Sequence, residues 1–308
     1  MRNLDPRLLR TALAALALAL ALALPGAALA QSPKLKLGIY APSVDFGSAT
    51  ARLQYVQALG KAIEQSTGLV VEAQSYASLA TLSQEGVDLA IIDGLCYAKN
   101  LGGRLLATAT IGGATTRPWA LYASVPDMQS LAGKKLSYIT TGCRDADFID
   151  NAMLDSEING SFFGARIGKP DLAAAVAEVA ATKTAQAVFA PIGAAKNLTK
   201  LFDTGAVPNP AFVDLNGKLP AGVSEKIAAA VIGHGGAGAI SGWARPSRDI
   251  YATFAGQLNK VVKNGMLATP DPVRIDARDV LIEPPTLRES AMVGLRHHFV
   301  RAPGGRIE

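Results

Sequence analysis

The sequence predicts an α/β protein built of two lobes, and three observations carry this prediction. First, short continuous apolar runs, such as 87–92 and 186–191, alternate with stretches of helical periodicity. Continuous apolar strands separated by helices are typical of mostly parallel sheets covered on both faces. Second, the same order of elements occurs twice, before and after Pro126. Third, 308 residues are enough for two domains of ordinary size. We therefore expect each lobe to be a mostly parallel sheet flanked by helices.

The first set of elements begins with a strand over 34–40 and an amphipathic helix over 49–65. One face of this helix carries four apolar side chains, namely Leu53, Val56, Leu59 and Ile63. Strands are expected over 69–74 and 87–92, with Ser78 as the N-cap of a short helix between them.

The second set follows Pro126, and its expected elements are a helical turn over 127–133, a strand over 135–140, helices over 145–157 and 170–182, and a strand over 186–191. Three β-rich runs are expected to cross between the lobes, and they are 105–111, 119–125 and 212–215. Helices expected over 224–233, 249–263 and 287–298 would return to the first lobe. The predicted boundaries are 31–117 with 213–308 for lobe 1, and 118–212 for lobe 2.

The first 30 residues have the pattern of a cleavable export signal. Arg2, Arg7 and Arg10 form a basic start, 12–24 is an apolar run, and 28–30 is a small-x-small cleavage sequence. The run has 13 residues, whereas a membrane-spanning helix needs about 20. We therefore expect a soluble protein of the periplasm.

Composition excludes several functions. Removal of residues 1–30 takes away three Arg and one Asp, so the formal charge falls from +5 to +3. No cluster of Lys and Arg suited to a phosphate backbone is present, so nucleic acid is not an expected partner. The sequence has none of the spacings of common metal, nucleotide or hydrolase motifs, and we expect no metal, no cofactor and no enzymatic activity.

Four sequence stretches resemble a known family, and they are Leu37-Gly38-Ile39-Tyr40, Val87-Asp88-Leu89-Ala90, the run from Leu131 to Tyr138, and 173–181 followed by Gln186-Ala187-Val188-Phe189. Their order and spacing resemble type II periplasmic solute-binding proteins, most closely the phosphate- and phosphonate-binding branch that serves ABC transporters. The resemblance implies two α/β lobes joined by two strand hinges, which close like a Venus flytrap over a small ligand.

The resemblance places the ligand at the carboxyl ends of the strands and the amino ends of the helices. The physics of open parallel sheets and of helix N-termini agrees with this placement. The expected ligand-binding residues are Tyr40, Ser43, Asp93, Gly94, Tyr97, Thr141, Gly142 and Arg144. Phosphonate binders place a Ser/Thr-rich turn where this chain has 140–145, and its Cys143-Arg144-Asp145 departs from that pattern.

Several of these assignments leave alternatives open. Arg144 could bind an anionic ligand, or it could pair with Asp145 or Asp147. The loop after Tyr40 could contact a ligand, or it could be a turn that ends in an N-cap at Ser48.

The chain contains two cysteines, Cys96 and Cys143, which the lobe assignment puts in loops of opposite lobes. Three states are compatible with the sequence: two free thiols, an intermolecular link, or a disulfide across the cleft.

These observations predict a monomeric periplasmic solute-binding protein. It would capture a small polar ligand, anionic or zwitterionic, and present it to a membrane permease of an ABC transporter. The alternatives are a ligand sensor and a small-molecule-converting enzyme on the same fold. The enzyme would need a nucleophile such as Cys143 with His234 as its base.

Overall fold

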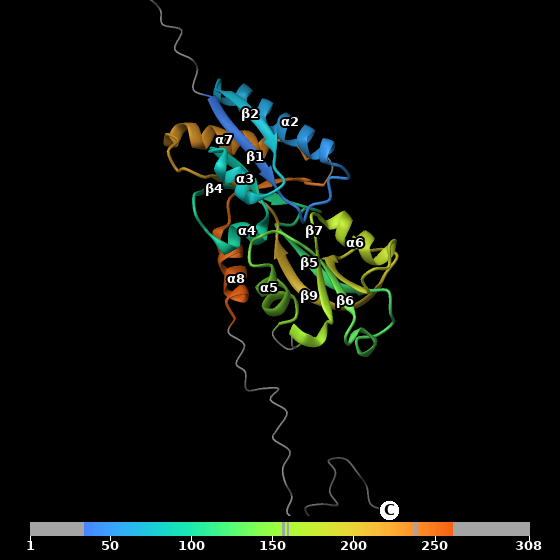
Figure 1. Ribbon diagram of the computed structural model, residues 1–308. Coiled ribbons are helices and arrows are strands. Elements are labelled where there is room, and N and C mark those ends of the chain that lie inside the picture. Colours follow the sequence, from blue (N-terminus) through green and yellow to red (C-terminus); the bar gives the residue numbers. More distant parts are fainter. Residues whose placement is uncertain (1–33, 156–157, 159, 237–238, 261–308) are drawn as a thin grey trace, which may run out of the picture. The chain divides into compact units, whose positions relative to one another are not determined.

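The computed structural model describes residues 34–155, 158, 160–236 and 239–260 (Figure 1). The predicted export signal, the helix over 287–298 and the ends of the helices over 145–157 and 249–263 lie outside the described residues. Within the described ranges, no helix has both the length and the apolar character required to cross a membrane.

The first sheet has six strands in the described part of the chain, in the order β11-β4-β10-β3-β1-β2. Strands β1, β2 and β3 pair in parallel, whereas β10, β4 and β11 are added antiparallel. The bounds are β1 Lys34–Tyr40, β2 Val70–Ser75, β3 Leu89–Ile92, β4 Arg104–Thr110, β10 Ala211–Asp214 and β11 Gly242–Ala244.

The second sheet has five strands among the described residues, in the order β7-β6-β8-β5-β9. It repeats the plan of the first, because β6, β7 and β8 pair in parallel and β5 and β9 are antiparallel. The bounds are β5 Thr116–Ala123, β6 Lys135–Ile139, β7 Ala165–Lys169, β8 Ala187–Pro191 and β9 Thr199–Pro208. We call each sheet with its helices a lobe.

The two-lobed α/β prediction is confirmed, while the strand directions are more mixed than predicted. The chain crosses from β4 to β5 through the first linker (111–115), and from β9 to β10 through the second linker (208–210). Because the two crossings run in opposite directions, β10 pairs antiparallel with β4, and β5 with β9. The run at 212–215 was expected to cross between the lobes, but most of it lies inside the first sheet as β10, and the crossing comes just before it.

The helices agree with the sequence pattern where strong caps exist. The α2 helix has its N-cap at Ser48 and ends at Gly68, whose φ of 72° is the left-handed conformation that glycine favours. Asp171 caps α6, and Ser78 caps α3 as predicted. The described helices are α2 Ala49–Thr67, α3 Leu79–Gln84, α4 Gly94–Lys99, α5 Asp145–Asp147, α6 Leu172–Ala180, α7 Ala221–Gly233 and α8 Arg248–Leu258, with the short 3-10 helices Gln129–Leu131 and Gly160–Phe162 and the π-helical segment η2 Phe148–Met153.

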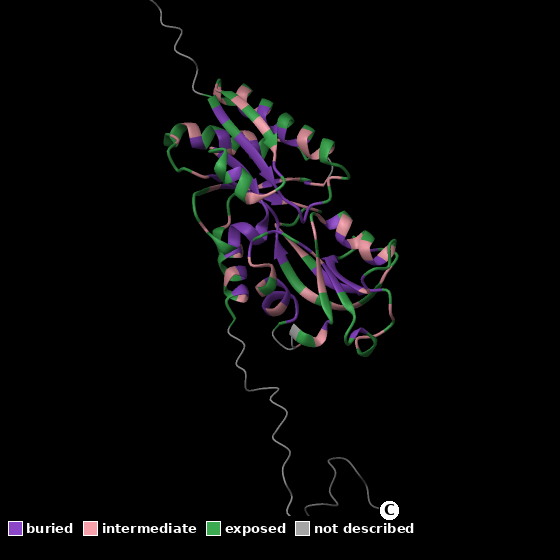
Figure 2. Ribbon diagram, in the orientation of Figure 1, coloured by how far each residue is buried: buried purple, intermediate pink, exposed green. Residues whose placement is uncertain are grey.

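The apolar core is divided unequally. One cluster lies within the first lobe, where Phe212 and Trp243 pack with their ring centroids 5.8 Å apart. The larger cluster fills the second lobe and continues into α4 and α8. Figure 2 shows the buried residues concentrated in the strands and in α4. The α8 helix therefore packs on α4 and also on η2 and β9 of the second lobe.

Candidate functional site

The loops that follow β1, β3 and β6 meet where the two lobes face each other. The Tyr40 hydroxyl donates a hydrogen bond to the carbonyl oxygen of Thr141 at 3.0 Å. The Leu172 amide donates to the carbonyl of Pro42 at 3.0 Å. We call these contacts, which join β1 and its loop to the second lobe, the interlobe seam.

Burial of the Tyr40 side chain strengthens its role as a donor. The ring is 4% exposed, and this desolvation raises the pKa of Tyr40 to about 12, with Asp93 and Asp145 acting in the same direction and Arg52 opposing them. The hydroxyl therefore keeps its proton at neutral pH and remains a hydrogen-bond donor across the seam.

Asp93 is the N-cap of α4, and its carboxylate is 1% exposed. One carboxylate oxygen accepts the amide of Leu95 at 3.2 Å, and the other accepts the amide of Ser43 at 3.0 Å. A buried carboxylate is stable only when such donors replace water. Asp93 thus fixes the loop after β1 against α4.

Arg117 is a buried residue between the lobes that the sequence did not single out. Its Nε donates to the Asn209 side chain of the second linker at 2.8 Å, and both terminal nitrogens donate to the carbonyl of Ser43 at 3.3 Å. One of them also lies 3.3 Å from the Ser43 hydroxyl. Burial lowers the pKa of Arg117 to about 10, and the negative charge of Asp93 works against that shift. Arg117 therefore ties the loop after β1 to the point where the chain crosses between lobes.

Gly94 and Tyr97 lie on α4 but face the second linker and α8. A side chain at Gly94 would overlap the carbonyl of Pro208, so only glycine allows this close approach. The Tyr97 ring packs edge-on against Tyr251 with centroids 4.8 Å apart. The hydroxyl of Tyr251 donates to the carbonyl of Asn209 at 2.9 Å. These two predicted site residues thus lie against the linker.

The turn after β6 is closed by a carboxylate of the chain itself. Asp145 accepts the amide of Thr141 at 3.0 and 3.2 Å and the amide of Gly142 at 3.0 Å. The Thr141 hydroxyl donates to the same carboxylate. The resemblance assigns such donors to the oxygens of a bound oxyanion, and here Asp145 takes that position.

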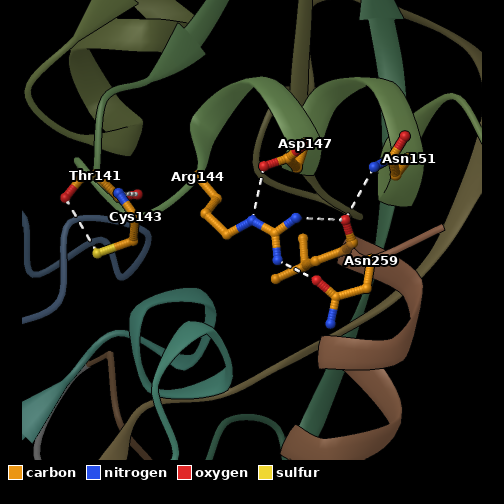
Figure 3. Close-up of polar contacts among 7 residues, drawn as sticks. Thr141, Cys143, Arg144, Asp147, Asn151 and Asn259 are labelled. Atoms are coloured by element: carbon orange, nitrogen blue, oxygen red, sulfur yellow. Dashed lines mark hydrogen bonds and ion pairs between the residues drawn. The ribbon is translucent and has the colours of Figure 1, made fainter. Parts of the chain in front are cut away.

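Arg144 faces the carboxyl end of α8 (Figure 3). Its Nε pairs with Asp147 at 2.7 Å, and a terminal nitrogen donates to the carbonyl of Leu258 at 3.0 Å. Another terminal nitrogen contacts the side chain of Asn259. Asn151 donates to the same Leu258 carbonyl at 2.9 Å. A cation at a helix C-terminus is favourable, so the structure gives Arg144 a contact for α8 and does not bring it to Ser43 and Asp93.

Cys96 and Cys143 form a disulfide with their Cα atoms 5.0 Å apart. Of the three states that the sequence left open, the structure has the bridge between the lobes. Both cysteines are buried, at 3% and 0% exposure. Without a thiol, Cys143 cannot serve as the nucleophile of the alternative enzyme. His234 lies elsewhere, with its ring 6.1 Å from that of Tyr55.

Two hollows that share Asp45 lie where the lobes meet, and we call them together the groove. None of the eight residues expected to bind the ligand lines either hollow. The first hollow has a volume of about 90 Å³ and lies between the N-termini of α2 and α6, next to Arg52 and Asp171. The second has about 360 Å³ and is bounded by α6 and the loop after β8, which carries Lys196. The groove thus has two cationic and two acidic side chains. No group of His, Cys, Asp and Glu in the described ranges is arranged to hold a metal ion.

Comparison with known proteins gives the fold. No protein-family model and no curated protein sequence matches the chain. A binding protein component of an ABC phosphonate transporter from Pseudomonas aeruginosa superposes with a TM-score of 0.57 and 14% identity, over 74% of this chain and 85% of that one. The chain has the fold of a type II periplasmic binding protein. PhnD1 from Prochlorococcus marinus in complex with methylphosphonate shares this fold, with a TM-score of 0.57 and 13% identity over 74% of this chain and 99% of that one. A Xanthomonas citri protein bound to chloride ion also shares it, with a TM-score of 0.55 and 12% identity over 73% of this chain and 97% of that one. In this fold the loops after β1, β3 and β6 meet because each of them leaves the carboxyl end of a strand. Ligands of open α/β sheets bind at that edge.

Proposed function

We propose that the protein is a periplasmic solute-binding protein that captures a small polar ligand between its lobes and presents it to the membrane permease of an ABC transporter. The observation that carries this proposal is the groove, because both lobes line it and because it carries charges of both signs. The binding proteins of similar fold include two phosphonate binders by name. The expected export signal and monomeric state agree with such a role.

The charges of the groove favour a zwitterion over a phosphonate. Arg52 and Lys196 can hold an anionic group, while Asp45 and Asp171 can hold a cationic group. The turn after β6 offers no equivalent anion site, since Asp145 already accepts its donors. A ligand with a carboxylate and an amine would match this distribution.

Native mass spectrometry of the protein purified from the periplasm tests the proposal first, by identifying a small molecule that co-purifies. Calorimetry with that compound, and with a panel of amino acids, phosphonates, phosphate and sulfate, then measures affinity. We expect Arg52→Ala and Lys196→Ala to raise the dissociation constant at least about tenfold, since each removes a charged hydrogen bond.

Lys34→Ala is the matched control, because Lys34 pairs with Glu72 in the open at the start of β1 and lines neither hollow. Its affinity should equal that of the wild type. A bound ligand whose affinity is unchanged in both groove variants would show that the groove is not the binding site.

A further inference from the structure

We propose that the Cys96–Cys143 disulfide acts as a latch that holds the two lobes in the closed arrangement. The lobes separate only when the bridge is reduced to two thiols. The proposal concerns the motion of the lobes, and only its consequence for ligand exchange rests on the proposed function.

The position of the bridge supports this reading. Cys96 lies in the first turn of α4, directly after β3 of the first sheet, and Cys143 lies in the loop after β6 of the second sheet. Within the described residues, the chain itself connects the sheets through the two linkers. Two chain connections alone permit rotation about the line that joins them. A third covalent connection opposes that rotation.

The surroundings of the bridge are those of a closed seam. The two sulfurs lie 3.9 and 3.5 Å from the carbonyl oxygen of Thr141, which also accepts the hydroxyl of Tyr40. A disulfide sulfur carries no proton, so these are packing contacts in the bridged form. The covalent and the hydrogen-bonded connections therefore hold the same arrangement of the lobes.

The first hollow of the groove is so small that holding the lobes closed would hinder the entry of a ligand. The first hollow lies between residues of both lobes and has about 90 Å³, whereas pockets for small molecules have about 300 to 1,000 Å³. A ligand that both lobes enclose there needs the α2 and α6 N-termini to separate. The intact bridge would restrict that separation, because it is a third covalent connection between the lobes.

Release of the latch is a thiol–disulfide exchange. A thiolate of a dithiol reductant attacks one sulfur of the bridge, forms a mixed disulfide and displaces the other cysteine as a thiolate. The second thiol of the reductant then displaces the first cysteine. The reductant becomes a disulfide, and the protein gains two electrons and two protons. Because both cysteines are buried, this exchange should be slow in the closed form.

Amide hydrogen exchange measured by NMR tests the latch without any ligand. The Leu172 amide reports on the seam, since its acceptor Pro42 belongs to the other lobe. The Ala174 amide is a matched reference in the same helix turn, because it is bonded to Asp171 of its own lobe at 2.8 Å. Dithiothreitol should speed exchange at Leu172 by at least about tenfold while Ala174 changes little. The double variant Cys96→Ser/Cys143→Ser should exchange like the reduced protein and should not respond to dithiothreitol.

Two results would overturn the proposal. Equal exchange at Leu172 in the oxidised and reduced forms would show that the bridge does not restrain the lobes. An equal acceleration at Leu172, Ala174 and the amides of β1 and β3 would show that the bridge stabilises the fold as a whole. Because no ligand is used, neither result bears on whether the protein binds a solute.

Discussion

Replacement of Arg117 by methionine tests the network at the linkers. Methionine keeps most of the apolar stem but removes every hydrogen bond to the Asn209 side chain and to the Ser43 carbonyl. A hydrogen bond to a charged group contributes about 1.5 to 3 kcal/mol, and the Asn209 side chain and the Ser43 carbonyl each lose a charged donor. We therefore expect the free energy of unfolding to fall by about 3 kcal/mol or more.

Urea denaturation followed by tryptophan fluorescence measures this change, because Trp119 lies two residues from the substitution on β5. Lys200→Met is the control, since Lys200 pairs with Asp203 on β9, where the side chains are 45% and 60% exposed. Such a pair contributes at most about 1 kcal/mol. If Arg117→Met destabilised the protein no more than Lys200→Met does, the network would not fix the linkers.

Two further predictions concern α4 and the seam. Gly94→Ala should destabilise the protein by about 3 kcal/mol or more, since the new methyl group would overlap the second linker. Gly222→Ala, in open space on α7, should instead stabilise the protein slightly. Equal effects of the two variants in thermal unfolding would contradict the steric argument. Because the folded pKa of Tyr40 is raised to about 12, its contribution to stability is complete below the unfolded value of about 10 and is lost as the pH rises towards 12. Tyr40→Phe should therefore lower stability by about 1 kcal/mol at neutral pH and flatten the decline between about pH 10 and 12. Urea denaturation midpoints of the wild type and of Tyr40→Phe, measured across that pH range, would contradict this reasoning if both midpoints fell equally.

The sequence predicted elements whose pattern is local and strong. The strand over 34–40 was predicted with the bounds of β1, in which exposed Lys34 and Lys36 alternate with buried leucines. The prediction for β8, a continuous buried apolar run, differs by one residue. The β9 strand was missed, since it is an edge strand with mostly exposed side chains and no apolar run. The β7 strand, at the other edge of the second sheet, was missed because its residues are exposed or half-buried and form no apolar run.

The site was harder to predict because its contacts join distant parts of the chain. Arg117 contacts residues 74 and 92 positions away, and nothing near it in sequence distinguishes it from an exposed arginine. The strand-end loops that were predicted to face each other do meet, since Tyr40 contacts Thr141 at the seam. It could not show that Asp145 would close the turn after β6, because that depends on backbone conformation.

The apolar cluster that continues from the second lobe into α4 and α8 affects how the protein folds. The rings of Trp119 and Phe148 pack 5.5 Å apart, and Phe148 in turn contacts Phe254 of α8 at 6.3 Å. A fragment containing only the strands of the second sheet would expose this aromatic surface to water. A cut at the two linkers leaves α8 with the first lobe, so we expect the second lobe to be unstable when it is produced by itself.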